Sequence, residues 1–268
     1  MNNNNIKLIA TDLDGTLLND DSEITDYNKN ILKKLIEKGI DVVLATGRPT
    51  SSMDFYCKEL QNNSESIVFN GAMVVDKNYN SIFSNPLKKE IVYEIIKLYE
   101  TKYINNTSLN LYCKKQYIVA KDDFKIQTHT EKVDKKNKIV GLENFNDNIE
   151  VQKMIILAEN EILIDIKNTI DNLFTVHTSF SNPNFLEILS ENTNKANALK
   201  WLCNKKGIDR ENVIAFGDNY NDIEMIEFAG VGVAMGNAEM KIKKNAKYVT
   251  DTNNNNGVGV FLKDFFNL

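Results

Sequence analysis

The sequence predicts an α/β fold, a doubly wound, parallel (Rossmann-like) sheet core with an inserted α+β domain. Three observations predict it. Short apolar runs alternate with segments of helical period near both ends of the chain, which is the order of a strand–helix–strand fold. Several of these runs are continuously apolar, as parallel strands are when helices cover both faces of their sheet. The middle of the chain instead carries short alternating strands, which indicates a separate, mixed domain.

The N-terminal part supplies the first strands of the parallel sheet. A helix is predicted between the first two strands, because Ile31, Leu32, Leu35 and Ile36 recur on one helical face and Gly39 follows as a C-terminal cap. The predicted elements are a strand over 6–10, a helix over 26–38, a strand over 40–48, and a strand over 66–72 followed by a hairpin at 77–78.

The C-terminal part repeats the same alternation of strands and helices. This order favours further strands of the same doubly wound parallel sheet. The predicted elements are a helix over 194–206, a strand over 213–218, a helix over 221–228, a strand over 230–235 and a helix from Asn237.

The middle segment is predicted to be a second domain inserted into the first. Two Ser-Asn-Pro tripeptides, at 84–86 and 181–183, bracket it and suit turns or hinges. We therefore expect a core of residues 1–84 and 188–268 and an inserted domain of residues 85–187. The predicted elements of this domain are helices over 88–99 and 161–172 and strands over 109–113, 117–120, 151–158, 173–180 and 185–189, with a solvated lysine-rich loop around 132–138.

The composition excludes several classes of function. The formal net charge is -5, which gives no electrostatic reason to expect a nucleic-acid partner. No apolar run approaches the length that crosses a bilayer, and no signal peptide is expected. Cys57, Cys113 and Cys203 lie far apart without a C-x-x-C spacing, which favours free thiols in a cytoplasmic protein over disulfides or a zinc site. The asparagine runs 2–5 and 253–256 are expected to be solvated, and no oligomeric state is predicted.

The first apolar run ends in two aspartates, Asp12 and Asp14, with one leucine between them. Like charges at this distance repel, and a buried carboxylate is costly unless a cation compensates it. The pair is therefore either a solvated strand end or part of a metal site. Ligands bind beyond the carboxyl ends of the strands in open α/β sheets, so the groups that follow the other strands bear on this choice.

Three further polar groups are expected at that edge of the sheet. They are Thr46-Gly47-Arg48 after the second strand, Lys195 at the start of a helix, and the segment 217–222 after a C-terminal strand. A carboxylate can attack phosphorus when the charge of the phosphate is neutralised. Mg²⁺ prefers carboxylate and water oxygens and often shares its site with a substrate phosphate. The set therefore predicts magnesium-dependent phosphoryl transfer, in which the cation compensates the two aspartates.

These residues also resemble a known family. The segments DLDGTLL (12–18), TGR (46–48), a helix-opening lysine and GDNYND (217–222) are similar, in this order, to the four motifs of the haloacid dehalogenase (HAD) superfamily of phosphohydrolases. The segments FNGA, FLEIL and VGVAMGNA resemble its Cof-type branch, whose members carry an α/β cap inserted between the second and third motifs. The resemblance covers nearly the whole chain and implies that the inserted domain is a cap that sets substrate specificity. One difference is that Ala196-Asn197 follow the lysine, where the family usually has a glycine.

The resemblance implies a role for each matching residue. Asp12 is implied as the nucleophile and a magnesium ligand, and Asp14 as the general acid and base, with its backbone carbonyl on the metal. Asp218 is implied as the third protein ligand of the metal. Asp222 is implied to contact the metal ligands without binding the metal itself. The residues implied to hold the phosphoryl group are Leu13 and Gly47 through their amides, Thr46, Lys195 and Asn221, while Arg48 and Asn70 line the side that faces the cap.

Each of these residues has a simpler interpretation when it is taken alone. Thr46-Gly47 would be an ordinary strand-to-helix turn, and Lys195 would be one surface lysine among many. Asp218 and Asp222 could serve a helix N-terminus, where acidic groups are favourable. Four motifs in the right order favour the catalytic interpretation. His129 and His177 lie in the inserted segment and receive no role.

The predicted function is magnesium-dependent hydrolysis of phosphomonoesters of small metabolites, with sugar phosphates expected, through an aspartyl-phosphate. Two alternatives remain open. A hexose phosphomutase of the same superfamily shares the nucleophile, and free phosphate measured against isomer separates the two. A non-catalytic metabolite-sensing module would keep the fold, but it needs no pair of nucleophile and acid. The sequence names neither the substrate nor the cap residues that select it.

Overall fold

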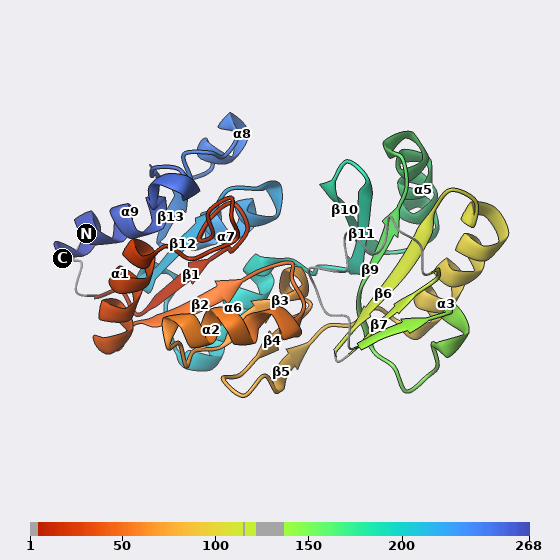
Figure 1. Ribbon diagram of the computed structural model, residues 1–268, viewed down its shortest axis with the longest axis horizontal. Coiled ribbons are helices and arrows are strands. Elements are labelled where there is room, and N and C mark those ends of the chain that lie inside the picture. Colours follow the sequence, from red (N-terminus) through yellow and green to blue (C-terminus); the bar gives the residue numbers. More distant parts are fainter. Residues whose placement is uncertain (1–4, 115, 122–136) are drawn as a thin grey trace. The chain divides into compact units, whose positions relative to one another are not determined.

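The structure is a computed structural model that describes residues 5–114, 116–121 and 137–268. They form two units (Figure 1). Unit 1 comprises Met1–Gly47, Met53–Ile82 and Asn194–Leu268, and unit 2 comprises Arg48–Ser52 and Phe83–Thr193. The predicted α/β fold with a parallel sheet core and an inserted α+β segment is confirmed.

The sheet of unit 1 has the strand order β14-β13-β12-β1-β2-β3-β4-β5 within the described residues. Neighbouring strands from β14 to β3 are parallel, and β4 runs antiparallel to β3. The chain adds β2 and β3 on one side of β1 and later adds β12, β13 and β14 on the other, so the order reverses between β1 and β12. The strands are β1 Leu8–Thr11, β2 Asp41–Ala45, β3 Ser66–Val68, β4 Met73–Val75, β5 Ser81–Ser84, β12 Val213–Gly217, β13 Val231–Ala234 and β14 Tyr248–Val249.

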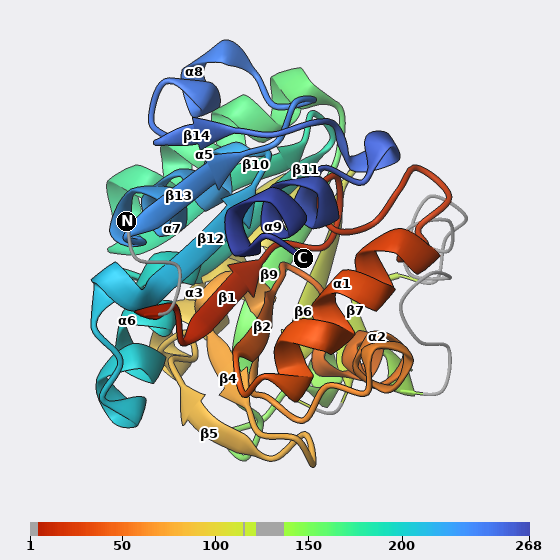
Figure 2. The same ribbon diagram turned by 90° about the vertical axis from the view of Figure 1, so that its left-hand side faces the viewer.

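Helices cover both faces of this sheet. Figure 2 shows α1 and α9 side by side, with α2 beside α1, in front of the sheet, and α6 and α7 behind it. The central strands β1, β12 and β13 are buried along their whole length, which explains their continuously apolar sequences. The helices are α1 Asp26–Glu37, α2 Met53–Leu60, α6 Lys195–Lys206, α7 Ile223–Phe228, α8 Met240–Lys243 and α9 Gly257–Phe266.

Local signals in the sequence set the ends of α1 and α6. The Thr25 hydroxyl accepts a hydrogen bond from the amide of Asn28 and caps α1, and Asn194 caps α6 in the same way through the amide of Asn197. The predicted apolar stripe of α1 is confirmed, because Ile31, Leu32 and Leu35 are buried.

The strand expected over 66–72 is shorter than predicted. Strand β3 ends at Val68, because Phe69 and Asn70 adopt left-handed φ values of 52° and 53° and turn the chain into β4. The run of apolar residues in this segment does not reveal the turn. The helix expected from Asn237 likewise begins only at Met240.

The asparagine run 253–256 is not fully solvated, which corrects the prediction from composition. Asn253 is 5% exposed, and its side-chain amide donates hydrogen bonds to the carbonyl of Leu18 and to Asp20. The run forms a 3-10 turn before α9 that ties the C-terminal segment to the loop after β1. Of the other asparagine run, residues 2–4 lie outside the described residues and Asn5 is exposed.

The sheet of unit 2 has the order β10-β11-β9-β6-β7-β8 in the described part of the chain. Its neighbouring strands are antiparallel except for β7 and β8. Helices α3 and α5 pack on one face, where they share an apolar cluster with alternate residues of the strands (Figure 1). The elements are α3 Lys89–Leu98, β6 Ser108–Cys113, β7 Tyr117–Val119, β8 Lys138–Val140, β9 Val151–Leu157, α5 Asn160–Leu173, β10 Val176–Asn182 and β11 Phe185–Ser190.

The predicted boundary between residues 187 and 188 falls inside β11. This strand pairs with β9 and β10, so all of it belongs to unit 2, which ends at Thr193. The strand over 185–189 was predicted in this domain, but its apolar sequence does not reveal where the domain ends. His177 is exposed on β10, whereas His129 and nearly all of the lysine-rich run lie outside the described residues.

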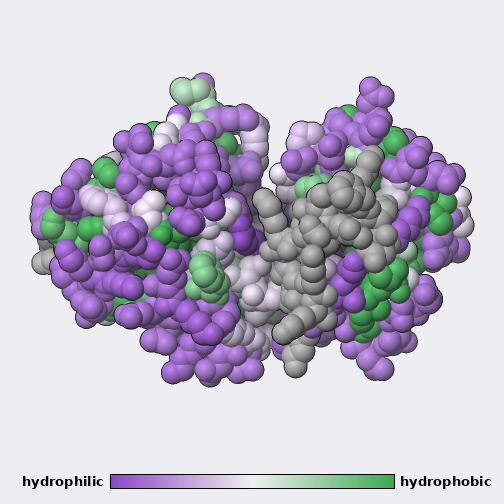
Figure 3. All heavy atoms as spheres, in the orientation of Figure 1, coloured by the Kyte–Doolittle hydropathy of each residue, from purple (hydrophilic) through white to green (hydrophobic). Residues whose placement is uncertain are grey.

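The cysteines are free thiols, and all three are buried. Cys57 lies on α2 and Cys203 on α6 in unit 1, and Cys113 lies on β6 in unit 2. Burial raises the pKa of each thiol, to about 11 for Cys203 and to about 12 for Cys113. Within the described chain, no helix combines the length and the apolar composition of a membrane span. Hydrophilic side chains cover most of the molecular face in Figure 3.

Candidate active site

The candidate site lies at the carboxyl end of β1 and β12, where the strand order of unit 1 reverses. Thr11 pairs with Phe216 in register, so Asp12 follows one strand beside Gly217 and Asp218 on the other. The amide of Asp12 donates to the carbonyl of Phe216 over 3.1 Å. The parallel register therefore brings two segments together that lie far apart in sequence, at the edge where α/β sheets bind ligands.

Lys195 connects two carboxylates in the interior of the site. Its side chain is 1% exposed, and its Nζ lies 2.5 Å from Asp12 Oδ1 and 2.7 Å from Asp222 Oδ1. Burial alone would lower the pKa of this ammonium, but the charges of Asp12 and Asp222 raise it above its ordinary value. Lys195 is therefore a permanent cation, and its position as the first residue of α6 fixes the direction in which it reaches.

Asp222 uses both of its oxygens within the protein. Oδ1 accepts from Lys195, and Oδ2 accepts from the backbone amides of Asp218 and Asn219 at 3.1 Å each. The side chain is fully buried. Asp222 thus holds the loop after β12 in place and orients Lys195.

The side chain of Asp218 is held by a hydrogen bond from the turn that follows β1. The Thr16 hydroxyl donates to Asp218 Oδ1 over 2.6 Å, and the carboxyl is half-buried. Burial raises the pKa of Asp218 to about 6, with a further contribution from Asp222 and opposition from the Thr16 hydrogen bond. Burial also raises the pKa of Asp12 well above its usual range, although Lys195 opposes this shift.

The balance of charge at the site favours a divalent cation. Asp12, Asp218 and Asp222 can each offer a carboxylate oxygen within 4.8 Å of the others, and Lys195 is the cation that pairs with two of them. Burial is the main cause of the raised pKa values of Asp12 and Asp218, and a bound cation would offset the cost of keeping both carboxylates charged. A set of hard oxygen donors with surplus negative charge fits Mg²⁺. Because the oxygens of Asp222 are already bonded, Asp12 and Asp218 are the side chains suited to direct coordination.

The turn after β1 places Asp12 and Asp14 in opposite environments. Asp12 is 5% exposed, whereas Asp14 is exposed to solvent. The turn needs Gly15, whose φ is +80° and where a Cβ would lie 2.5 Å from Asp218 Oδ2. Leu13 is fully buried, so its backbone amide is what it can offer to a ligand.

Residues from the second motif, the turn after β3 and the fourth motif also meet. The amide of Asn70 donates to the carbonyl of the buried Thr46 over 2.9 Å. The side-chain amide of Asn221 donates to Asn70 Oδ1 over 3.0 Å. A Cβ on Gly47 would lie 2.9 Å from the same oxygen. Arg48, the remaining predicted residue, is half-buried and belongs to unit 2.

Two residues of the site have no predicted role in the sequence analysis. Thr16 holds Asp218, and Asn237 donates from its side-chain amide to the carbonyl of Gly15 over 2.8 Å. Both lie inside segments that resemble family motifs, which is the signal that could have pointed to them. Their partners are more than 200 residues away in sequence, and spacing alone does not identify such partners.

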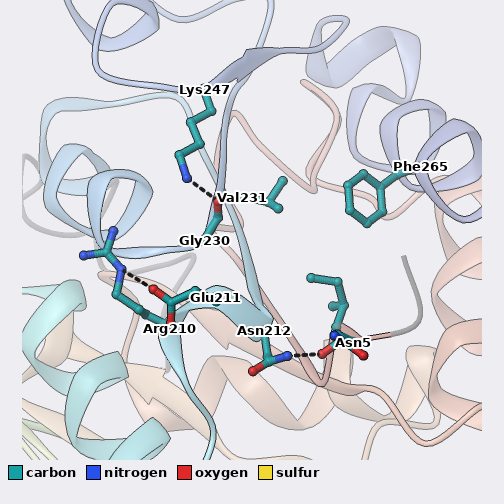
Figure 4. A pocket seen from close by; sticks show the side chains of 9 residues that line it. Asn5, Arg210, Glu211, Asn212, Gly230, Val231, Lys247 and Phe265 are labelled. Atoms are coloured by element: carbon teal, nitrogen blue, oxygen red, sulfur yellow. Dashed lines mark hydrogen bonds and ion pairs between the residues drawn. The ribbon is translucent and has the colours of Figure 1, made fainter. Parts of the chain in front are cut away.

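A separate pocket lies at the amino ends of β1, β12 and β13, the opposite edge of the sheet (Figure 4). Its volume is about 250 Å³. Arg210 pairs there with Glu211 at 3.7 Å, and Lys247 Nζ donates to the carbonyl of Gly230 over 2.6 Å. No predicted site residue lines this pocket.

Comparison with known proteins gives consistent similarities. Residues 9–262 match a model of the haloacid dehalogenase-like hydrolases. The chain is 32% identical over 273 residues to the 5-amino-6-(5-phospho-D-ribitylamino)uracil phosphatase YitU of Bacillus subtilis, covering 97% of this chain and 98% of that protein. It is also 32% identical over 253 residues to YcsE, the phosphatase of the same name from that organism, covering 94% and 93%. A crystal structure of a haloacid dehalogenase-like hydrolase from Bacteroides thetaiotaomicron superposes with a TM-score of 0.86 at 32% identity, covering 97% of this chain and all of that one.

Proposed function

The chain belongs to the haloacid dehalogenase-like hydrolases and is a phosphatase of small phosphorylated metabolites, and we propose that it requires Mg²⁺ and acts on sugar phosphates. One observation carries the proposal. A buried lysine joins Asp12 to Asp222 within a group of three carboxylates, which leaves a need for further positive charge. The relatives named for a phospho-D-ribitylamino compound support a substrate whose phosphate is carried by a polyhydroxylated chain.

We propose that Asp12 and Asp218 hold the magnesium ion together with the backbone carbonyl of Asp14. When bound, the ion neutralises the charge of the phosphate and of the carboxylates. Asp222 keeps the loop of Asp218 in position. The free thiols support a reducing compartment, the cytoplasm.

In the proposed reaction, a carboxylate oxygen of Asp12 attacks phosphorus and forms an aspartyl-phosphate while the bond to the ester oxygen breaks. Asp14 donates a proton to the departing alcohol oxygen. Asp14 then takes a proton from a water molecule, which attacks phosphorus and frees Asp12. The proton that Asp14 gives to the alcohol in the first step is thereby restored in the second.

The remaining predicted residues bind and orient the phosphoryl group in this proposal. Lys195 supplies a fixed positive charge beside the nucleophile. Thr46, Asn221 and the amides of Leu13 and Gly47 are proposed to bind the phosphoryl oxygens. Arg48 and Asn70 are proposed to line the substrate side, and unit 2 to be the cap that selects the substrate.

Phosphate release from a panel of phosphomonoesters tests the proposal. We expect turnover with Mg²⁺, none after treatment with EDTA, and poor support by Ca²⁺, whose larger and more flexible coordination shell misplaces the carboxylate. Asp12→Asn should lower turnover by about 10³-fold or more while the fold is kept, because an amide is not a competent nucleophile.

Asp21→Asn is the matched control, because Asp21 is exposed and lies outside the site. It should keep full activity. Full activity after exhaustive chelation, or near wild-type turnover by folded Asp12→Asn, would contradict the proposal. Conversion of a hexose 1-phosphate to its isomer without free phosphate would favour a mutase instead.

A further inference from the structure

Two segments that the proposed reaction does not use meet beside the turn that carries Asp14. They are VGVAMGNA (231–238) and the asparagine run 253–256. Each follows a parallel strand, β13 or β14, so both lie at the carboxyl edge of the unit 1 sheet. The amide of Gly236 donates to the carbonyl of Asp251 over 3.0 Å, and the amide of Asn253 donates to Asn237 Oδ1 over the same distance. The two segments therefore form one hydrogen-bonded structure.

This structure fixes the orientation of the Asn237 side chain. A backbone amide can only donate, so the amide of Asn253 must face the oxygen of this side chain and not its nitrogen. The nitrogen then faces the carbonyl of Gly15, which can only accept, over 2.8 Å. Asn237 does not cap α8, whose N-cap residue is Glu239. Its side chain is directed to the turn after β1 instead.

Gly15 is the position of that turn at which the backbone has the most freedom. Glycine adopts more φ and ψ values than any other residue, and Gly15 directly follows Asp14. The structure restricts this freedom from two sides. On one side, a Cβ on Gly15 would lie 2.5 Å from Asp218 Oδ2, and the next residue, Thr16, donates to Asp218 Oδ1. On the other side, Asn237 holds the carbonyl of Gly15.

The asparagine run holds the later part of the same turn. Asn253 Nδ2 donates to the carbonyl of Leu18 and to Asp20 Oδ1, at 3.1 Å each. The amide of Asp20 donates to Asn254 Oδ1 over 3.0 Å, and Asn254 Nδ2 donates to Asp20 Oδ2 over 2.8 Å. The turn is thus attached to the C-terminal segment at residue 15 and again at residues 18–20.

We propose that Asn237, supported by Asn253, is a positioning residue for proton transfer by Asp14. This inference rests on the proposed function, in which Asp14 is the general acid. Asp14 is exposed, so packing restrains its side chain little, and the backbone of the turn must set its place. Proton transfer requires the donor within hydrogen-bond reach of the departing oxygen. The hydrogen bond from Asn237 to the Gly15 carbonyl supplies that precision.

A positioning role and a purely structural role predict different kinetics. If Asn237 acts through Asp14, its loss should slow the step in which Asp14 donates a proton. An alkyl phosphate needs this proton, whereas p-nitrophenolate departs without it. The effect should also vanish when residue 14 can no longer donate, because residues that act through one contact are not additive.

Single-turnover rates of Asn237→Asp and Asn237→Ala test the proposal. Aspartate keeps the acceptor for Asn253 but cannot donate to Gly15, and alanine removes the hydrogen bond without adding charge. The substrates are p-nitrophenyl phosphate and whichever of glucose 6-phosphate, ribose 5-phosphate and 3-phosphoglycerate the wild type hydrolyses fastest. Both variants should lower the rate on the alkyl phosphate by about 3- to 10-fold, as expected for one hydrogen bond. The burst with p-nitrophenyl phosphate should change by less than about twofold.

A double-mutant cycle adds the second measurement. In the Asp14→Asn protein, the same two substitutions at Asn237 should change the rate on the alkyl phosphate by less than about twofold. A residue that only stabilises the fold would cost the same factor with and without Asp14.

Asn245→Asp and Asn245→Ala are the matched controls. The side-chain amide of Asn245 donates to the carbonyl of Lys241 over 2.8 Å, which is the same kind of bond at the same length as the one from Asn237 to Gly15. It lies outside the turn. The control variants should lose similar stability in urea unfolding and keep both rates, so any effect of lost stability alone would appear in both pairs of variants.

The outcomes separate this inference from the proposed function. If the variants at Asn237 lose equally on both substrates, lose on neither, lose equally with and without Asp14, or lose no more than the controls, the positioning role is overturned and the phosphatase proposal stands. A wild type that hydrolyses p-nitrophenyl phosphate but none of the three alkyl phosphates also overturns this inference, because no alcohol then receives a proton. A wild type that releases phosphate from no ester overturns the proposed function, and this inference with it.

Discussion

Asp12 and Asp14 are separated by one residue, yet their surroundings differ in every respect that matters for proton transfer. Asp12 is buried against a permanent cation, whereas Asp14 is exposed beyond the turn at Gly15. A carboxylate held beside an ammonium is suited to nucleophilic attack, and one in contact with solvent can gain and lose a proton in each cycle. The conformation of the turn, rather than the residue type, places one carboxylate in the interior and the other in solvent.

Asp14→Asn should slow the first chemical step by an amount that depends on the leaving group. Proton donation by a positioned group contributes about 10²–10⁴-fold, so a sugar phosphate should lose a factor of that order. p-Nitrophenolate departs without a proton, so the step that forms the aspartyl-phosphate should change little. Stopped-flow bursts with p-nitrophenyl phosphate and single-turnover rates with a sugar phosphate measure the two effects. Equal losses with both substrates would show that Asp14 is not the proton donor.

Some site residues could be predicted from the sequence because the reaction needs their functional groups, whereas others could not because their partners lie far away in sequence. Asp12, Lys195 and Asp218 stand in short motifs because phosphoryl transfer needs their functional groups at strand and helix ends. Thr16 and Asn237 in the site, and Asn253 outside it, act through partners that only the folded chain brings near. Composition alone suggested a solvated run at 253–256, because asparagine is usually exposed and its buried hydrogen bonds depend on the fold.

At the scale of elements, the turn after β3 and the start of α6 pack closely together. Gly71 has φ +96°, and a Cβ at this position would overlap the carbonyl of Asn194, the N-cap of α6. Lys195 is the next residue. The backbone of the turn therefore helps to set the position from which the lysine reaches Asp12.

Gly71→Ala should destabilise the protein by about 3 kcal/mol or more, because left-handed strain adds to the displacement of α6. Turnover should also fall, since Lys195 moves with the helix end. Gly39→Ala is the matched control, with φ +82° and no atom within 4 Å of the added Cβ. It should cost about 1–2 kcal/mol from strain alone and leave kcat unchanged. Urea unfolding and kcat measurements on both variants check this, and a loss of kcat in the control would contradict it.

Elements with strong periodicity were predicted well, and their ends less so. Helix α1 and the central strands follow from apolar spacing because their neighbours bury them as the pattern requires. The left-handed turn at Phe69-Asn70 cannot be predicted from apolar spacing, because phenylalanine rarely adopts a left-handed φ and Asn70 is held there by contacts with Thr46 and Asn221. The strand over 185–189 was predicted in the inserted domain, but the predicted boundary at 187–188 cuts through β11, because the extent of its pairing with β9 and β10 is a property of the tertiary fold.

For the whole molecule, the raised pKa values at the site make stability depend on pH and metal. Burial raises the pKa of Asp218 to about 6 and also raises that of Asp12, whereas in the unfolded chain both lie near about 3.9. Between these values the folded state binds more protons than the unfolded state. The contribution of Asp218 to stability therefore falls as the pH rises from about 4 to about 6, and its loss is complete above that range, while the raised pKa of Asp12 acts in the same direction.

Asp218→Asn should accordingly stabilise the metal-free protein by about 1–3 kcal/mol at about pH 7.5, and by much less at about pH 5. Urea unfolding in EDTA at the two pH values measures the difference. Mg²⁺ should stabilise the wild type and leave the variant nearly unchanged, because a ligand that binds the folded state raises its stability. An equal effect of the substitution at both pH values would contradict this account.

The three buried thiols can be used to measure partial unfolding of the protein. A thiol reagent reaches a buried cysteine only when the surrounding structure opens, so labelling rates report local unfolding. Cys113 reports on unit 2, and Cys57 and Cys203 report on unit 1. If each unit opens about its own core, Mg²⁺ should slow labelling of Cys57 and Cys203 and leave Cys113 unaffected, as peptide mass spectrometry of pulse-labelled protein can resolve. Equal slowing at all three positions would mean instead that the two units unfold as one.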